Sequence, residues 1–246
     1  MYIKKPEEIE KMRVAGKILS DLFKMLEEFI VPGKTTEEID KFCHEFIVSS
    51  GATPSFLNYE GFPKSICTSI NEVVVHGIPS KRVLKEGDII GIDLGACYEG
   101  YHADACRTYP VGKISEEKRR LIEVTKECFF EGIKNLKAGV RIGVISNAVQ
   151  KHAEENGYTL VRELVGHGIG KHLHEDPNVP NYGSKDSGPV VLENACLAIE
   201  PMVNMGKRNI LLERDGWTII TRDRKPSAHY ENTVVVTKEG VEILTL

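Results

Sequence analysis

The segment GDIIGIDLGACYEGYHADACRTY, Gly87–Tyr109, has the residue pattern of two strands joined by a tight turn. The turn falls within Tyr98–Gly100, and the aspartates Asp93 and Asp104 lie on either side of it. A turn centred on Tyr98 and the residue after it places the two aspartates opposite each other, with Cβ atoms about 4.5–5.5 Å apart. A bulge at the glycine of the turn would shift this register.

The residues around these aspartates are compatible with a cation site. Asp93 shares one strand face with Gly91 and Gly95, and the missing side chains would leave space beside its carboxylate. Ile92 and Leu94 point to the opposite face, where we expect a hydrophobic core. Two opposed carboxylates next to an apolar face would suit a bound cation. The alternative is a pair of aspartates exposed to solvent on a polar face, which is common.

Helical and strand periodicities surround this segment in an order that occurs twice. Helices are predicted for residues 5–30, 35–51, 116–136 and 142–156. Strands are predicted for the segments SICTSI, EVVVHGI, LVRELV, CLAIEPMV, WTIIT and NTVVVT, besides the two strands of the opening segment. Each pair of helices therefore precedes a group of strands.

A glycine spacing accompanies this repeated order. Gly33 and Gly51 are 18 residues apart, and so are Gly139 and Gly157. We predict an α+β fold made by a diverged duplication, although a chance match of two amphipathic helices gives the same spacing. The prediction is one domain, residues 1–246, with pseudo-symmetric halves of about 1–112 and 113–246 and a central sheet covered by helices.

The composition is that of a globular protein and argues against several classes. Apolar residues make up 41% and charged residues 28%, and the net charge of −4 does not favour nucleic acid as the partner. The charged N-terminus does not resemble a secretory signal, and no apolar run approaches the ~18 residues of a membrane span. The six scattered cysteines, without a C-x-x-C pair, predict free thiols in the reducing cytoplasm.

Further acidic residues and histidines stand at the ends of apolar runs. Glu200 closes one such run and Glu231 opens another, while His76 follows a third. Taken singly, such residues more often mark strand ends or lie exposed than bind a ligand. Glycines on both sides of His167 would allow a close backbone approach and free its imidazole. The spacing alone does not choose among three neighbouring histidines, His167, His172 and His174.

Five segments together resemble the type I methionine aminopeptidases of the short bacterial kind. They are SINEVVVHGIP, GIDLGACYEGYHADACRTY, GHGIGKHLHEDP, AIEPMV and HYENTVVV, and in this order they extend the resemblance over essentially the whole chain. The resemblance implies the pseudo-symmetric pita-bread (creatinase/aminopeptidase) fold. It also implies an enzyme that hydrolyses the first peptide bond and so removes the initiator methionine. The implied metal ligands are Asp93, Asp104, His167, Glu200 and Glu231.

The resemblance assigns further roles within the site. It implies two divalent ions, for which Mn²⁺, Fe²⁺, Co²⁺ and Zn²⁺ are candidates, with Asp104 and Glu231 as bridging ligands. Catalytic roles fall on Glu200, His76 and His174, and the two histidines also contact substrate. The implied methionine pocket consists of Tyr59, Phe62, Cys67, Leu173 and Trp217. Relatives often have tyrosine at position 62 and another aromatic residue at 173, and Trp217 could instead be a core aromatic residue.

The resemblance also implies partners and leaves alternatives open. We expect a monomeric cytoplasmic protein without membrane contact that acts on the N-terminal methionine of nascent chains, with the ribosome as a possible partner. One alternative is another hydrolase of the same fold, an X-Pro aminopeptidase or prolidase. Those enzymes generally carry a large N-terminal domain, whereas the first predicted helix begins near residue 5. The other alternative is a non-enzymatic binding protein, against which the complete ligand set argues.

Overall fold

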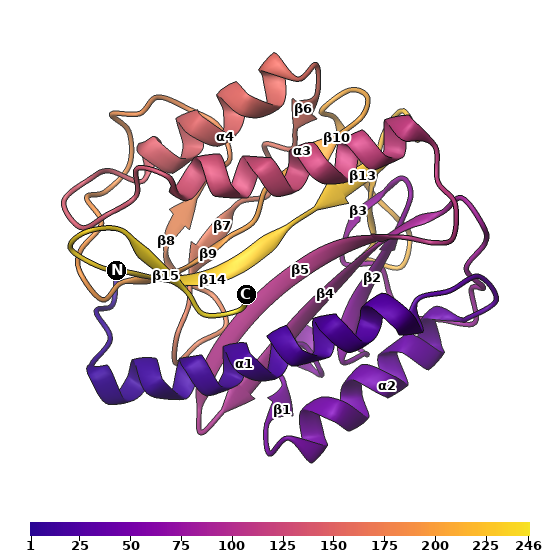
Figure 1. The fold of residues 1–246 in the computed structure, drawn as a ribbon, viewed down its shortest axis with the longest axis horizontal. Coiled ribbons are helices and arrows are strands. Elements are labelled where there is room, and N and C mark those ends of the chain that lie inside the picture. The colour runs from indigo at the N-terminus through magenta and orange to yellow at the C-terminus, as the bar shows by residue number, and fades with distance from the viewer.

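A computed structural model describes all 246 residues, and its strands form one large sheet with two small ones (Figure 1). The strand order of the large sheet is β1-β4-β5-β14-β9-β7-β8, with β2 also paired to β4 and β15 to β14. Every pairing is antiparallel. The central antiparallel sheet expected from the sequence is therefore confirmed, and β5 and β14 join its two halves.

The elements of the first half end with β5 at Pro110, and those of the second half follow it. The helices are α1 Pro6–Phe29, α2 Thr36–Ser49, α3 Glu116–Ile133 and α4 Gly143–Glu155. The strands of the first half are β1 Thr53–Pro54, β2 Ile66–Ile70, β3 Val73–Val75, β4 Ile89–Tyr98 and β5 Tyr101–Pro110, with a 3-10 turn at Tyr59–Gly61.

The second half contributes ten shorter strands. They are β6 Thr159–Leu160, β7 Gly166–Gly168, β8 Glu175–Val179, β9 Cys196–Ile199, β10 Met202–Asn204, β11 Ile210–Leu212, β12 Ile219–Thr221, β13 Ser227–His229, β14 Glu231–Val236 and β15 Val241–Ile243. The predicted strand CLAIEPMV is two strands, because Pro201 cannot donate to a ladder and interrupts the pairing. Most of the predicted strand LVRELV is irregular beyond Leu160.

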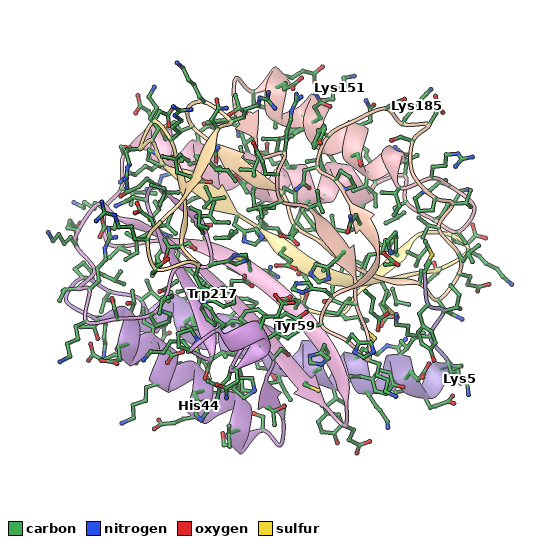
Figure 2. The ribbon with its side chains drawn as sticks, turned by 180° about the vertical axis from the view of Figure 1, so that it is seen from behind. Lys5, His44, Tyr59, Lys151, Lys185 and Trp217 are labelled. Atoms are coloured by element: carbon green, nitrogen blue, oxygen red, sulfur yellow. The ribbon has the colours of Figure 1, made fainter.

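The four helices cover one face of the large sheet and leave the other face open to the site (Figures 1 and 2). Ile92 and Leu94 lie on the covered face in a core with residues of α1 and α2, as expected from their alternation with Asp93. A second core packs α3 and α4 against β9 and β14. Local sequence fixes where the helices begin, since Thr35 caps α2 through the amide of Glu38. No helix is long and apolar enough to cross a membrane.

The two helix pairs end in matching turns. Gly33 and Gly139 both have φ of 94°, and Gly51 and Gly157 have φ of 80° and 81°. The Gly51 amide donates to the carbonyl of Val48, and the Gly157 amide donates to that of Glu154. Gly33 and Gly139 are 106 positions apart in the chain, and so are Gly51 and Gly157. These equivalent hydrogen bonds support the interpretation of the glycine spacing as a diverged repeat.

The β4–β5 hairpin has a different register from the one predicted. Its two turn residues are Glu99 and Gly100, with φ of 45° and 81°, and Tyr98 pairs with Tyr101. Positive φ at both positions is typical of the two-residue type I′ turn, which fits the twist of a hairpin. Asp93 therefore pairs with Cys106, and Asp104 pairs with Gly95. The aspartates are diagonal neighbours on one face, and the prediction that they sit directly opposite was wrong.

Candidate active site

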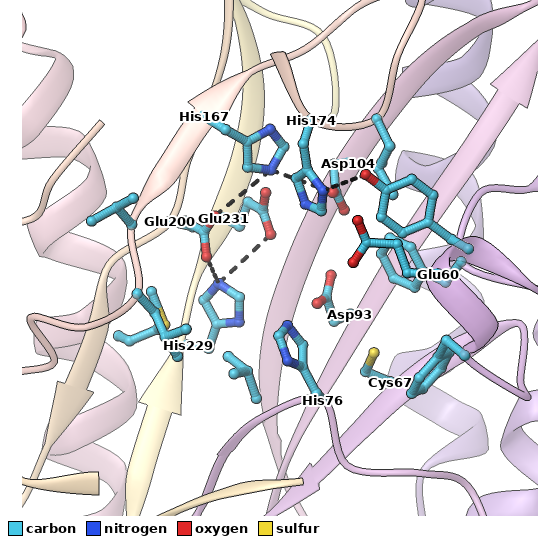
Figure 3. A pocket seen from close by; sticks show the side chains of 18 of the residues that line it. Glu60, Cys67, His76, Asp93, Asp104, His167, His174, Glu200, His229 and Glu231 are labelled. Atoms are coloured by element: carbon cyan, nitrogen blue, oxygen red, sulfur yellow. Dashed lines mark hydrogen bonds and ion pairs between the residues drawn. The ribbon is translucent and has the colours of Figure 1, made fainter. Parts of the chain in front are cut away.

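The open face of the sheet has a cavity of about 560 Å³, and every residue that the sequence assigned to the site lines it (Figure 3). His172, for which no role was expected, is exposed and lies outside this cavity. No lysine or arginine lines the cavity, whereas seven acidic residues do, five of them buried or half-buried. The residues in question are Tyr59, Phe62, Cys67, His76, Asp93, Asp104, His167, Leu173, His174, Glu200, Trp217 and Glu231.

The five expected metal ligands stand on five consecutive strands of the large sheet. Asp93 lies on β4 and Asp104 on β5, Glu231 begins β14, Glu200 directly follows β9, and His167 is the middle residue of β7. The register brings their side chains to the same face.

The pairings that produce this alignment lie close to the junction of the two halves. Cys106 is paired with Asp93 on one side and with Glu231 on the other. Because Asp104 is two residues from Cys106, it shares the face of these acids. His167 pairs with Ala198 on β9, two residues before Glu200.

Glycine is required at two positions beside His167. A Cβ atom at residue 166 would lie 2.4 Å from the carbonyl oxygen of Ala198, and one at residue 168 would lie 2.4 Å from that of Asp176. Neither strand could come so close to a side chain. The close approach that the sequence predicted from these glycines is therefore present, and it places His167 deep in the sheet.

The space beside Asp93 differs from the expectation. A Cβ atom at Gly95 would lie 2.7 Å from the Cβ of Ser55 and 2.7 Å from the ring of Phe56. The chain after β1 therefore fills this space, and the amide of Ser55 donates to the carbonyl of Gly95. Gly95 allows one wall of the cavity to approach β4. It does not provide the room for a cation that the sequence suggested.

The distances between the ligand atoms are those of groups that share a cation. Nε2 of His167 lies 3.9 Å from Oδ2 of Asp104 and 3.8 Å from Oε1 of Glu200. These separations are too long for hydrogen bonds. Two ligand bonds of about 2.1 Å to one ion, however, place their atoms up to about 4.2 Å apart. The Nδ1 atom of His167 lies 2.8 Å from the carbonyl oxygen of Gly168 and donates to it, so its Nε2 carries the free electron pair.

Several buried polar atoms of this cluster have no hydrogen-bond partner. They include Oδ1 of Asp93, Oδ1 of Asp104 and Oε1 of Glu231. Buried charged groups normally pair with an opposite charge or coordinate a metal. Atoms of Asp104, His167 and Glu231 lie within 4.8 Å of one another, the arrangement of a possible metal site. The donor set of four carboxylates and an imidazole thus fits one or more divalent cations.

The electrostatics of the cluster also favour a cation. Burial raises the pKa of Asp93 to about 7. Burial, together with the neighbouring carboxylates, raises the pKa values of Asp104, Glu200 and Glu231 well above their ordinary range. Burial lowers the pKa of His167 to about 4, so its imidazole is neutral near pH 7 and able to bind a metal. Positive charge among the acids would relieve their repulsion.

Two further histidines face the carboxylates from the other walls. The ring of His174 meets that of His167 edge to face at 4.3 Å, and its Nδ1 lies 2.9 Å from the hydroxyl of Tyr59. His76 follows β3 with φ of 58°, a strained conformation that turns its side chain into the cavity. Burial lowers the pKa of His76 to about 4. Burial also lowers the pKa of His174, so both rings are neutral at physiological pH.

The expected methionine pocket is one apolar cluster at the side of the acids. Phe62, Cys67 and Leu173 are buried, and Tyr59 and Trp217 pack against them. Trp217 is half-buried and meets Phe62 edge to face at 5.2 Å, so it both lines the cavity and packs on its wall. Cys67 pairs with Asp93 across β2 and β4, which joins the apolar wall to the acidic cluster.

His229 is a cavity residue that no pattern in the sequence assigned to the site. This residue ends β13, is 3% exposed, and lines the cavity beside Glu200 and Glu231 (Figure 3). The signal was its position two residues before Glu231, which places both side chains on one side of an extended chain. A lone histidine between an alanine and a tyrosine, just before the run that Glu231 opens, is not distinguishable from a core residue by its sequence.

The chain also matches a known protein family over most of its length. The model of metallopeptidase family M24 matches residues 10–238. The chain belongs to metallopeptidase family M24. Membership implies a divalent metal, in agreement with the donor set of the cavity.

Several members of family M24 resemble the whole chain. A methionine aminopeptidase of Clostridium perfringens is 51% identical over 246 residues, which are 100% of this chain and 99% of that protein. The crystal structure of a methionine aminopeptidase from Rickettsia prowazekii superposes with a TM-score of 0.98 at 42% identity and full coverage of both chains. The Xaa-Pro dipeptidase of Bacillus anthracis has a TM-score of 0.79 at 26% identity, and the match covers 61% of its chain. The pita-bread fold is thus confirmed.

Proposed function

We propose that this M24 metallopeptidase removes the N-terminal methionine from polypeptides by hydrolysing the first peptide bond. The observation that carries the proposal is the apolar cluster of Tyr59, Phe62 and Trp217 directly beside the acidic cluster. Full-length similarity to proteins named methionine aminopeptidases supports it. An unbranched thioether side chain suits an apolar pocket lined by aromatic rings and a thiol.

The proposed metal ligands are Asp93, Asp104, His167, Glu200 and Glu231. Three of the acids have unpartnered buried oxygens, and the spacing of the ligand atoms, with Glu200 3.8 Å from His167, fits divalent cations. Five ligands are more than one ion with open positions would need, so they would hold two ions, to both of which Asp104 and Glu231 would be ligands. Mn²⁺, Fe²⁺, Co²⁺ and Zn²⁺ suit this mixture of oxygen and nitrogen donors. When bound, such ions would supply Lewis acidity to the scissile carbonyl and to the attacking water.

His174 is placed to stabilise the negative charge that develops on the carbonyl oxygen. When the Tyr59 hydroxyl donates to Nδ1 of His174, the neutral ring carries its proton on Nε2. That N–H can donate to the oxyanion, and its lowered pKa keeps it a neutral donor. His76 lies across the cavity and is suited to hydrogen-bond the backbone of the substrate.

Glu200 is the proposed proton carrier. Its burial and its negative neighbours raise its pKa, which favours a carboxyl group able to accept a proton from water and return it to the leaving amine. Cleavage after the first residue also requires a negatively charged environment for the α-ammonium group of the substrate. Besides the four acids among the proposed metal ligands, the acids Glu60, Glu175 and Asp176 line the cavity, and no lysine or arginine does.

We also propose that residues 1–246 work as one catalytic domain with halves of about 1–112 and 113–246. Asp93 and Asp104 come from the first half, and the other three proposed ligands come from the second, so neither half holds the site alone. The free thiols, all but Cys97 buried, support a reducing cytoplasmic location. A monomer acting on nascent chains at the ribosome remains our prediction for its partners.

The specificity is tested by comparing two tripeptides, Met-Ala-Ser and Ala-Pro-Ala, with metal-free protein before and after addition of Mn²⁺ or Co²⁺. We expect metal-restored release of methionine from the first peptide and little cleavage of the second. Preference for Ala-Pro-Ala would instead favour the X-Pro enzymes. Absence of metal-restored cleavage with either peptide would favour a non-enzymatic protein.

A further inference from the structure

His229 is a buried imidazole whose ring is aimed at the acidic cluster. Its Nε2 lies 3.7 Å from Oε2 of Glu200 and 3.6 Å from Oε2 of Glu231, as the dashed lines of Figure 3 show. The atom is buried and has no hydrogen-bond partner. A buried ring nitrogen without a partner requires an explanation, because satisfied polar groups are the rule in protein interiors.

The two contacts of His229 do not have the lengths of hydrogen bonds. Donors and acceptors in proteins lie about 2.7–3.2 Å apart, and both separations exceed this range. They match two ligand atoms that bind one ion through bonds of about 2.1 Å, at an angle near 120°. The same comparison holds for His167 and its two carboxylates, so the two imidazoles relate to the acids in the same way.

The ligand atoms form two groups that share one acid. Asp104, His167 and Glu231 make the first group, and Asp93, His229 and Glu231 make the second, with atoms within 4.8 Å of one another in each. Each group therefore has one aspartate, one histidine and the shared glutamate. This composition is what two ions bridged by Glu231 would use.

The backbone holds His229 in this position. The hydroxyl of Thr108 donates to its carbonyl oxygen at 2.8 Å, and its amide donates to the same hydroxyl at 3.0 Å. It also pairs with Met202 at the end of β13. A residue tied at both backbone groups presents its ring without a large loss of conformational entropy on binding.

We propose that His229 is a metal ligand and binds, through Nε2, the same ion as Asp93. This inference rests on the proposed dinuclear site and adds a second imidazole to it. Imidazole favours Co²⁺ and Zn²⁺ over Mn²⁺ relative to carboxylate ligands. The metal site at Asp93 therefore has a donor set that favours Co²⁺ or Zn²⁺ over Mn²⁺.

The test counts imidazole ligands directly by X-ray absorption spectroscopy of the full chain loaded with two equivalents of Co²⁺. Wild type should show one imidazole per ion on average, from His167 and His229. His229→Gln should show one half per ion, and the control His172→Ala, which removes an exposed histidine, should match wild type. One half imidazole per ion in wild type, or no change in the Gln variant, would overturn the proposal.

Binding isotherms for Co²⁺ provide the second readout. Two different substitutions of His229 are compared, so that the test still stands if one of the variants packs poorly. His229→Gln and His229→Asn should each weaken one of two Co²⁺ sites by at least about 10-fold, the lower end of what lost outer-sphere partners cause. The loss should be smaller for Mn²⁺, and thermal unfolding of the metal-free variants checks their fold. Equal loss at both sites would indicate an orienting role and contradict ligation. Failure of the wild type to cleave Met-Ala-Ser would contradict the proposed function. It would not change the number of imidazole ligands per ion or the Co²⁺ affinities, which test the role of His229 separately.

Discussion

At the scale of single residues, the hydroxyl of Tyr59 decides which nitrogen of His174 carries the proton. Donation from Tyr59 to Nδ1 leaves the N–H on Nε2 of a ring that packs edge to face against the ring of His167. We expect His174→Ala to lower kcat by about 100-fold, the loss typical of one oxyanion donor, with a smaller change in KM. Steady-state cleavage of Met-Ala-Ser measures it.

Two other variants make this prediction specific. Tyr59→Phe should cause a smaller loss of kcat. It removes the hydroxyl that fixes the tautomer of His174 but keeps the imidazole of His174 in place. His172→Ala should be nearly silent because His172 is exposed outside the cavity. A large loss in His172→Ala together with a normal His174→Ala would show that the wrong histidine was chosen.

Asp104 is expected to be the least replaceable acid. It is 4% exposed, lies between the strands of Asp93 and Glu231, and is within reach of His167. Asp104→Asn keeps the size of the side chain but removes the negative charge that a bridging ligand needs. We expect activity to fall to background and the Mn²⁺ content to drop. Normal turnover in this variant would rule out a bridging role.

The residue identities of the site were more predictable than their geometry. Asp93, Asp104 and Glu231 lie in segments whose resemblance to a family assigns them a role, and all face one cavity. The hairpin register was not predictable from the midpoint of the segment, because two positive φ values at Glu99 and Gly100 decide it. His229 was missed because only the tertiary fold shows that its ring points to the acids.

At the scale of elements, β4 needs a glycine at position 95, because the chain that follows β1 packs directly against this position. A Cβ atom at Gly95 would meet Ser55 and Phe56 at 2.7 Å. Gly95→Ala should destabilise the protein by about 1–3 kcal/mol, the usual cost of overpacking. Gly240→Ala is the matched control, because nothing lies within 4 Å of its Cβ position and its φ is ordinary. Urea unfolding of both variants measures the difference.

A stability of Gly95→Ala equal to that of Gly240→Ala would mean that the wall at Ser55 and Phe56 is loosely packed.

Sequence periodicity correctly located the helices to within a few residues, since Pro6, Thr35 and Gly51 mark their ends locally. It could not locate the short strands β8 and β11. β8 reads Glu-Asp-Pro-Asn-Val and β11 reads Ile-Leu-Leu, so neither has the apolar–polar alternation of a half-buried strand, although each pairs with a strand close by in the chain across an irregular segment.

At the scale of the whole molecule, the acidic cluster links stability to pH and metal. The folded state raises the pKa of Asp93 to about 7 and raises those of the other three acids. A carboxyl group whose pKa is higher in the folded state than in the unfolded state binds more protons when folded, so stability falls as pH rises. The buried histidines have lowered pKa values and act oppositely, but their contribution is complete above about pH 7.

We therefore expect the metal-free protein to lose thermal stability between about pH 7 and pH 8.5, where the acids still titrate and the histidines are already neutral. Saturating Mn²⁺ should remove this decline, because the ions replace the protons and raise the stability in proportion to their binding. Scanning calorimetry with and without Mn²⁺ measures both effects. A decline of the same slope in the presence of Mn²⁺ would assign it to other groups, such as the buried thiols.

The central claim is that acids and an imidazole from both halves of the chain hold divalent ions at the junction of the sheet. Anomalous diffraction from crystals soaked in Mn²⁺ tests it most directly. We predict two anomalous peaks in the cavity, with Asp93, Asp104, His167, Glu200 and Glu231 in contact and Glu231 touching both. A map without a peak among these side chains, recorded under conditions in which Mn²⁺ restores activity, would contradict the claim.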